Sequence, residues 1–172
     1  MASDTDAHRW LVAASDVAVS AAYDEIVASS DDRARALRPT CLASGRCCQF
    51  EAFGHRLYVT GLESAMVLTR LRSAGHAMDG RATGVAIAES IASGCCPFLD
   101  RGGCGVHGLR PMPCRAFFCD RHAEDGIQSI HESAHAAMRA LHDRFSLPYA
   151  YGEWRHMLDR LVSARSGATI GT

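Results

Sequence analysis

Apolar residues recur at helical spacing near the start of the chain. Five of them fall on roughly one face of a segment from about residue 7 to 29, namely Trp10, Ala14, Val17, Ala21 and Ile26. This spacing predicts a helix with one buried face. The polar run from Ser29 to Arg33 is expected to end or interrupt the helix, and Pro39 enforces a break before Cys41.

Two more helices are predicted towards the C-terminus, over about 127–145 and 149–164. The second carries four large apolar residues at helical spacing, Trp154, Met157, Leu158 and Leu161. An apolar stripe of this kind is typical of a helix that packs on a core, so we assign it no chemical role.

The middle of the chain predicts shorter elements. Residues 55–59 indicate a short strand, and Thr60-Gly61-Leu62-Glu63 matches the capping box that opens a helix, here extending to about Arg72. A loop is expected from 75 to 84, and a helix from 85 to 91.

From Ser93 to Asp120 the periodicity disappears and the content of glycine, proline and cysteine rises. We expect a structured loop held by something other than a backbone ladder. The predicted fold class is therefore mainly α, a small helical domain with an irregular cysteine-rich metal-binding insert. Residues 1–172 would form a single domain, with a cysteine-cluster core at about 41–120 flanked by N- and C-terminal helices.

Composition and charge narrow the function classes. Of the 172 residues, 48% are hydrophobic and 22% charged, which is ordinary for a globular chain. A formal net charge of -1 gives no basic footprint for nucleic acid, and no apolar run reaches the roughly 18 residues of a membrane span. The N-terminal sequence lacks the basic and apolar regions of a signal peptide, so we expect a cytoplasmic location.

In a reducing cytoplasm the cysteines indicate metal or redox chemistry rather than disulfides. All eight fall between positions 41 and 119, at Cys41, Cys47, Cys48, Cys95, Cys96, Cys104, Cys114 and Cys119. Thiolates select zinc, copper(I) or iron–sulfur centres over magnesium and calcium. Nearby glycines let the backbone turn sharply, and three arginines could offset thiolate charge or simply be solvated, Arg46, Arg110 and Arg115.

The spacing leaves the metal open. A structural zinc site usually repeats a C-x2–4-C knuckle, and the one pair in that range is Cys114 and Cys119. The ferredoxin spacings are also absent. Adjacent cysteines such as Cys47 and Cys48 point apart, which suits a larger cluster or two neighbouring centres better than one mononuclear ion.

The order of these motifs resembles the YkgJ-type cysteine-cluster family, described as a zinc- or iron-chelating CxxCxCC domain. The resemblance runs from about Cys41 to Cys119, through Ser44-Gly45-Arg46-Cys47-Cys48, Cys96-Pro97-Phe98-Leu99, Cys104, Arg110-Pro111 and Cys114-Arg115. It implies an iron–sulfur or zinc centre and no particular reaction. This sequence has Ser44 where the family pattern has a second cysteine, and His107 where a tyrosine is common.

Seven cysteines are the candidate metal ligands, Cys41, Cys47, Cys48, Cys96, Cys104, Cys114 and Cys119. One cubane cluster needs four thiolates, so some of the seven are spectators or the site is larger. The thiolate missing at Ser44 could come from Cys119 or Cys95, and Cys95 is otherwise the first candidate for a spectator.

A second pattern is His131-Glu132-Ser133-Ala134-His135, the H-E-x-x-H signature of zinc enzymes, on a predicted helix. Glu153 could supply a third ligand. The histidines could instead bind a second metal or line the cluster. A structural role is the third alternative, because they and His142 border the apolar face of the same helix.

Three functions follow as hypotheses. The first is an iron–sulfur protein with a redox or sensing role and an unknown redox protein partner. The second is a structural zinc protein, and the third is a metal-dependent enzyme that uses His131, Glu132 and His135. Neither nucleic acid nor a membrane is an expected partner.

Overall fold

Residues 3–38, 44–116 and 124–167 are described in the computed structural model of this chain. The α-helices are α1 (Asp4–Ala14), α2 (Val17–Ala36), α3 (Gly61–Ser73), α4 (Gly84–Ser93), α5 (Met112–Arg115), α6 (Glu124–Arg144) and α7 (Trp154–Gly167). The 3-10 helices are η1 (Arg46–Cys48), η2 (Ala77–Arg81) and η3 (His107–Leu109). The strands are β1 (Tyr58–Thr60), β2 (Leu99–Asp100), β3 (Gly103–Cys104) and β4 (Tyr151–Glu153). The predicted mainly helical fold is confirmed.

The predicted single helix over 7–29 is wrong, because the chain breaks between α1 and α2. The Asp16 carboxylate accepts hydrogen bonds from the backbone N–H groups of Ala18 and Val19, at 2.8 and 3.0 Å, and so caps a new helix. The polar run from Ser29 to Arg33 does not end α2. The Ser30 hydroxyl donates to the Ile26 carbonyl one turn earlier, at 2.8 Å, so this polar side chain finds a partner within the helix.

Strand β1 lies later than the predicted 55–59 because it pairs antiparallel with β4, with Val59 opposite Gly152. This pairing also moves the start of the last helix from 149 to Trp154. The predicted capping box is confirmed at the start of α3. The Thr60 hydroxyl accepts from the Glu63 N–H at 3.2 Å, and the Glu63 carboxylate accepts from the Thr60 N–H at 2.8 Å.

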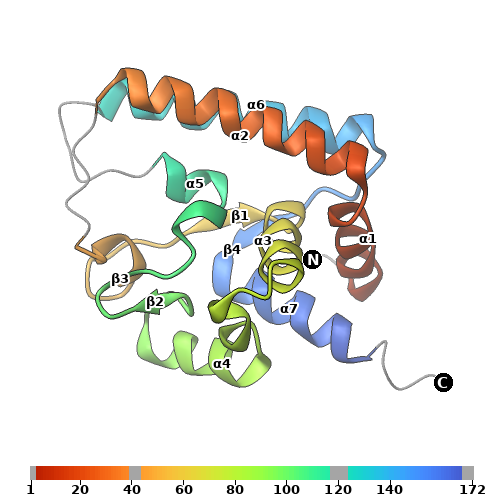
Figure 1. Cartoon of the computed structure of the whole chain (residues 1–172), viewed down its shortest axis with the longest axis vertical. Helices are drawn as coiled ribbons and strands as arrows, with labels where there is room; N and C mark the ends of the chain where they lie inside the picture. Colours follow the sequence, from red (N-terminus) through yellow and green to blue (C-terminus); the bar gives the residue numbers. More distant parts are fainter. Residues whose placement is uncertain (1–2, 39–43, 117–123, 168–172) are drawn as a thin grey trace.

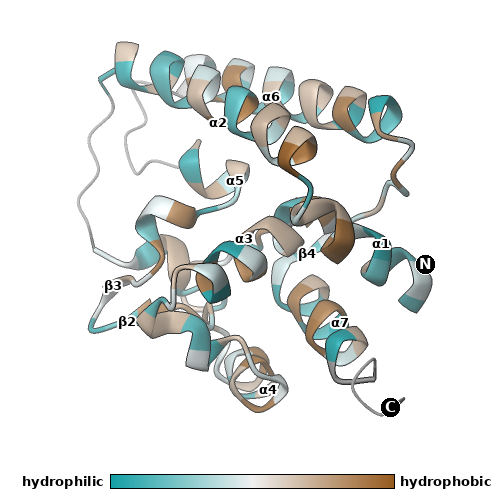
Figure 2. Cartoon of the chain, turned by 45° about the vertical axis from the view of Figure 1, so that its right-hand side comes forward, coloured by the Kyte–Doolittle hydropathy of each residue, from teal (hydrophilic) through white to brown (hydrophobic). Residues whose placement is uncertain are grey.

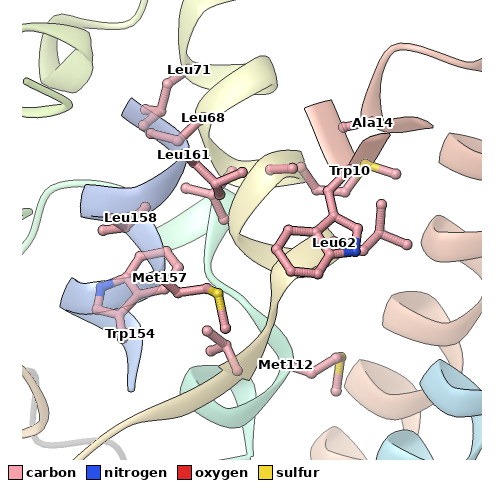
Figure 3. Close-up of a cluster of buried hydrophobic side chains, with 14 of the residues drawn as sticks. Trp10, Ala14, Leu62, Leu68, Leu71, Met112, Trp154, Met157, Leu158 and Leu161 are labelled. Carbon is pink, nitrogen blue, oxygen red and sulfur yellow. The ribbon is translucent and has the colours of Figure 1, made fainter. Parts of the chain in front are cut away.

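Helices α1, α3 and α7 pack against one another and form the core, with α3 in the middle of the view in Figure 1. Figure 3 shows the apolar side chains that meet there from the three helices, among them the buried stripe Trp154, Met157, Leu158 and Leu161. Trp10 is fully buried, and its indole N–H donates to the Pro148 carbonyl at 2.7 Å. Gly61 allows this approach, because a Cβ there would overlap the Trp10 ring. The prediction that the apolar stripe of the last helix packs in the core is confirmed.

Helices α2 and α6 form a second layer and lie side by side in Figure 1. Both alternate hydrophilic and hydrophobic residues along their length, as Figure 2 shows. The short helix α5 lies between this layer and the cysteine-bearing turns. No helix of the described residues is both long and apolar enough to cross a membrane.

Candidate metal centre

The first cysteine segment is fitted to the second by a glycine. Gly45 has a φ of 67°, the left-handed region that favours glycine, and it leads directly into η1, which carries Cys47 and Cys48. A Cβ at Gly45 would overlap the Gly102 carbonyl in the turn between β2 and β3. The two segments can therefore approach this closely because position 45 has no side chain.

Backbone hydrogen bonds hold the same two segments together. The Cys96 N–H donates to the Cys48 carbonyl at 2.7 Å, and the Glu51 N–H donates to the Gly94 carbonyl at 3.0 Å. Gly94 ends α4 with a φ of 71° and lies against the Glu51 side chain. The buried Arg155 adds an ion pair to Glu51, at 3.5 Å. Cys48 and Cys96 are neighbours as a result.

The remaining cysteines come from the hairpin and from α5. Strand β3 carries Cys104 and pairs with β2, and Gly105 donates to the carbonyl of the fully buried Phe98 at 2.9 Å. Helix α5 carries Cys114 and is held by a contact with α3. The Met112 N–H at its start donates to the buried carboxylate of Glu63 at 3.1 Å.

The Cys48 thiol lies at the centre of the cysteine group. It hydrogen-bonds to three neighbouring thiols, those of Cys104, Cys47 and Cys96. These contacts raise the pKa of Cys48, whereas hydrogen bonding from Cys48 lowers the pKa of Cys47 to about 6 and that of Cys104 to about 7. Cys47 and Cys104 are thus shifted towards the thiolate, which is the form that binds metal.

Two further groups bear on these sulfurs. The Val106 N–H hydrogen-bonds to the Cys104 sulfur, and the Arg110 guanidinium lowers the pKa of both Cys104 and Cys47. Burial, followed by the charges of Cys96 and Cys104, raises the pKa of Cys114. Cys114 thus belongs to the same electrostatic group.

The three arginines expected to offset thiolate charge have different surroundings. Arg110 acts on the thiols directly. Arg115 instead fixes the local backbone, donating to the carbonyls of Arg110 and Gly108 at 2.7 and 2.6 Å and to Asp31 at 2.7 Å. Arg46 is exposed, with its guanidinium 5.2 Å from the centre of the Phe53 ring.

Five of the seven candidate ligands are therefore brought together, Cys47, Cys48, Cys96, Cys104 and Cys114. Cys41 and Cys119 lie outside the described residues. The Cys95 thiol donates to the Ser93 carbonyl at 3.6 Å. Within the described ranges, no three His, Cys, Asp or Glu side chains already stand as ligands around one metal position. Metal binding would replace thiol–thiol hydrogen bonds with metal–sulfur bonds.

The donor set fits a thiolate centre. Several soft sulfur ligands converge, two have lowered pKa values, and a cation and a backbone N–H face them. The sequence missed Glu63 as part of this arrangement, because its capping-box position explained it fully. Its buried carboxylate also holds α5, and only the contact with Met112 shows that second role.

The histidines of the H-E-x-x-H pattern have other partners. The Tyr149 hydroxyl and His135 Nε2 are 2.7 Å apart, and the exposed Glu132 accepts from the Gln128 amide at 2.8 Å. Glu153, the suggested third ligand, pairs with Arg155 at 2.7 Å. The fully buried His142 shares a hydrogen bond of 2.9 Å with the Pro148 carbonyl. These contacts explain His135 and His142 as parts of the packing.

No family model matches this chain. Neither a curated protein nor a solved structure matches it. The resemblance to the YkgJ-type family stays a prediction.

Proposed function

We propose that this chain holds an iron–sulfur cluster through cysteine thiolates drawn from two segments. One observation supports the proposal: two cysteine segments distant in sequence lie against each other, joined by the hydrogen bond from the Cys96 N–H to the Cys48 carbonyl at 2.7 Å, and their thiols influence one another's pKa values. A cubane cluster takes four cysteine thiolates, so the group is large enough for one. Cys41 and Cys119 remain further candidate ligands.

The residues around the sulfurs have distinct roles in this proposal. Cys47 and Cys104 are the sulfurs most ready to bind as thiolates, and Arg110 offsets the charge that they and the other thiolates bring. The Val106 N–H hydrogen bond to the Cys104 sulfur is of the kind that tunes cluster potentials. Glu63 positions α5, and with it Cys114, through Met112.

A bound cluster supplies one-electron chemistry, which fits a redox or sensing protein in the cytoplasm. Such a protein exchanges electrons with a redox partner protein. The formal net charge of -1 gives no support to nucleic acid as a partner. The cytoplasmic location rests on the cysteine chemistry, since free thiols with thiolate character persist in a reducing compartment.

A structural zinc centre is the second candidate, and the mutual reach of the thiols favours it. Sulfurs bound at about 2.3 Å around one tetrahedral zinc lie only about 3.8 Å apart. The thiols of Cys47, Cys96 and Cys104 act directly on that of Cys48, so four sulfurs are available for one such ion. In this case the metal would fasten the hairpin and η1 together, and the helices would carry any partner contacts.

Replacement of one central and one peripheral cysteine tests the shared site. Cys48→Ser removes the thiol that touches three others, whereas Cys95→Ser removes one that donates to a carbonyl. We expect Cys48→Ser, purified without air, to lose most of the metal and Cys95→Ser to keep it, with unchanged far-ultraviolet circular dichroism in both. Equal metal content in the two variants would refute a site centred on Cys48.

A further inference from the structure

A charged pocket lies on the side of the cysteine group that faces α2. It has a volume of about 420 Å³ and lies between the end of α2, η3 and α5. Four arginines line it together with one histidine and one carboxylate, namely Arg35, Arg38, Arg110, Arg115, His107 and Asp31. Figure 1 shows α5 beneath α2 in this region. Four cations around one anion make a strongly positive wall.

Two of the four guanidinium groups are held by protein partners. Arg115 donates to Asp31, the carboxylate in the pocket wall, and to two backbone carbonyls. Arg35 pairs with Asp32 on the exposed side of α2. The acidic groups nearest the pocket are therefore already paired. Among the described residues, no carboxylate pairs with Arg38 or Arg110, and Arg110 faces the thiols of Cys47 and Cys104.

Arg110 and Arg38 have donors to spare. The Arg110 Nε donates to the His107 carbonyl at 3.0 Å, and its two terminal amino groups bond to none of the described residues. Arg38 is exposed and forms no side-chain hydrogen bond or ion pair within the described ranges. The two side chains reach the same pocket from different elements, since Arg38 follows α2 and Arg110 follows η3.

Charge compensation of the cysteines does not account for all four arginines. Arg110 acts on the thiols of Cys47 and Cys104. Arg35 and Arg38 instead enter the pocket from the α2 side. Guanidinium groups recognise planar or tetrahedral oxyanions through paired N–H donors, and several of them around one cavity are typical of a phosphate or carboxylate site.

We propose that this pocket binds the oxyanion group, phosphate or carboxylate, of a small molecule. Arg38 and Arg110 would donate to it directly, while Arg115 fixes the pocket wall through Asp31. The volume exceeds what one oxyanion fills and is in the range of small-ligand sites, so the ligand carries more than the anionic group. This proposal does not depend on the identity of the metal or on its presence.

Isothermal titration calorimetry with inorganic phosphate and with succinate, a weakly chelating dicarboxylate, tests the site at low, constant ionic strength. The full chain is used as isolated, together with Arg38→Gln, Arg110→Gln and a control, Arg72→Gln. Arg72 is exposed on α3 and lines no part of the pocket, yet its replacement changes the net charge equally.

Saturable binding of at least one probe is expected, weakened about tenfold or more in each pocket variant, as for loss of a charge-assisted hydrogen bond. The control should bind as the unchanged protein does. Preference for phosphate or for succinate assigns the kind of oxyanion. The proposal is overturned if neither probe saturates, or if Arg72→Gln weakens binding as much as Arg38→Gln. Arg38 is exposed, so its variant stays informative even if Arg110→Gln fails to fold.

Discussion

Gly45 gives the sharpest test of how the two cysteine segments meet. In Gly45→Ala a methyl group must adopt the left-handed backbone region and also displace the Gly102 carbonyl. The left-handed conformation costs an L-residue roughly 1–2 kcal/mol. Overpacking against a neighbour costs about 1–3 kcal/mol more. The expected loss of unfolding free energy is therefore about 2–5 kcal/mol.

Gly54 provides a matched control in the same segment. Its φ of 66° almost equals that of Gly45, but a Cβ at Gly54 would meet nothing within 4 Å. Gly54→Ala should cost only the conformational part, roughly 1–2 kcal/mol. Urea unfolding of both variants, with the unfolding slope compared to confirm the same transition, measures the difference.

Metal content of the same two proteins separates stability from site assembly. Displacement of Gly45 moves η1 away from the hairpin, so Gly45→Ala should bind less metal than Gly54→Ala. If the two variants lose the same free energy and keep the same metal, close packing of Gly45 on Gly102 does not hold the site together, and the reasoning fails.

Two other predictions concern the buried carboxylate and the metal itself. Burial raises the pKa of Glu63, so the native protein holds this proton above the ordinary value of 4.5. The bound proton stabilises the native protein fully at pH values below 4.5, and this stabilisation is lost as the pH rises through the pKa of Glu63 in the native protein. The melting temperature relative to Glu63→Gln should therefore fall with rising pH, and a constant difference would contradict this. Removal of metal by a strong chelator, or Cys96→Ser with Cys114→Ser, should lower the melting temperature by several degrees, because metal binding couples to folding. An unchanged melting curve would refute a convergent site.

The sequence predicts best those elements that depend on local signals. The capping box at Thr60 and Glu63 involves residues three apart. The helix start that it predicts is confirmed, because α3 begins at Gly61. The apolar stripe of α7 is set by helical period alone, and it is buried as expected. The break between α1 and α2 was also local, at the Asp16 cap, but the apolar period continues across it and concealed it.

Long-range contacts could not be read from the pattern. The sequence predicts a strand at 55–59, but the bounds of β1 are set by pairing with β4, about ninety residues later, which the local pattern does not contain. The approach of Cys48 to Cys96 depends on the fit of Gly45 to Gly102, which no spacing rule contains. The cysteines could be recognised as a candidate site from the sequence, because so many cysteines in one part of a chain indicate metal or redox chemistry. The arginine pocket could not be recognised from the sequence, because its charged side chains come from separate elements.

The proposed iron–sulfur cluster can be tested directly by measuring the iron, zinc and acid-labile sulfide in protein purified without air, together with its visible absorption spectrum. We expect iron with a matching amount of sulfide and the brown colour of a thiolate-bound cluster. Zinc without sulfide would contradict the cluster and make the centre structural, and protein with neither metal would contradict a metal site altogether.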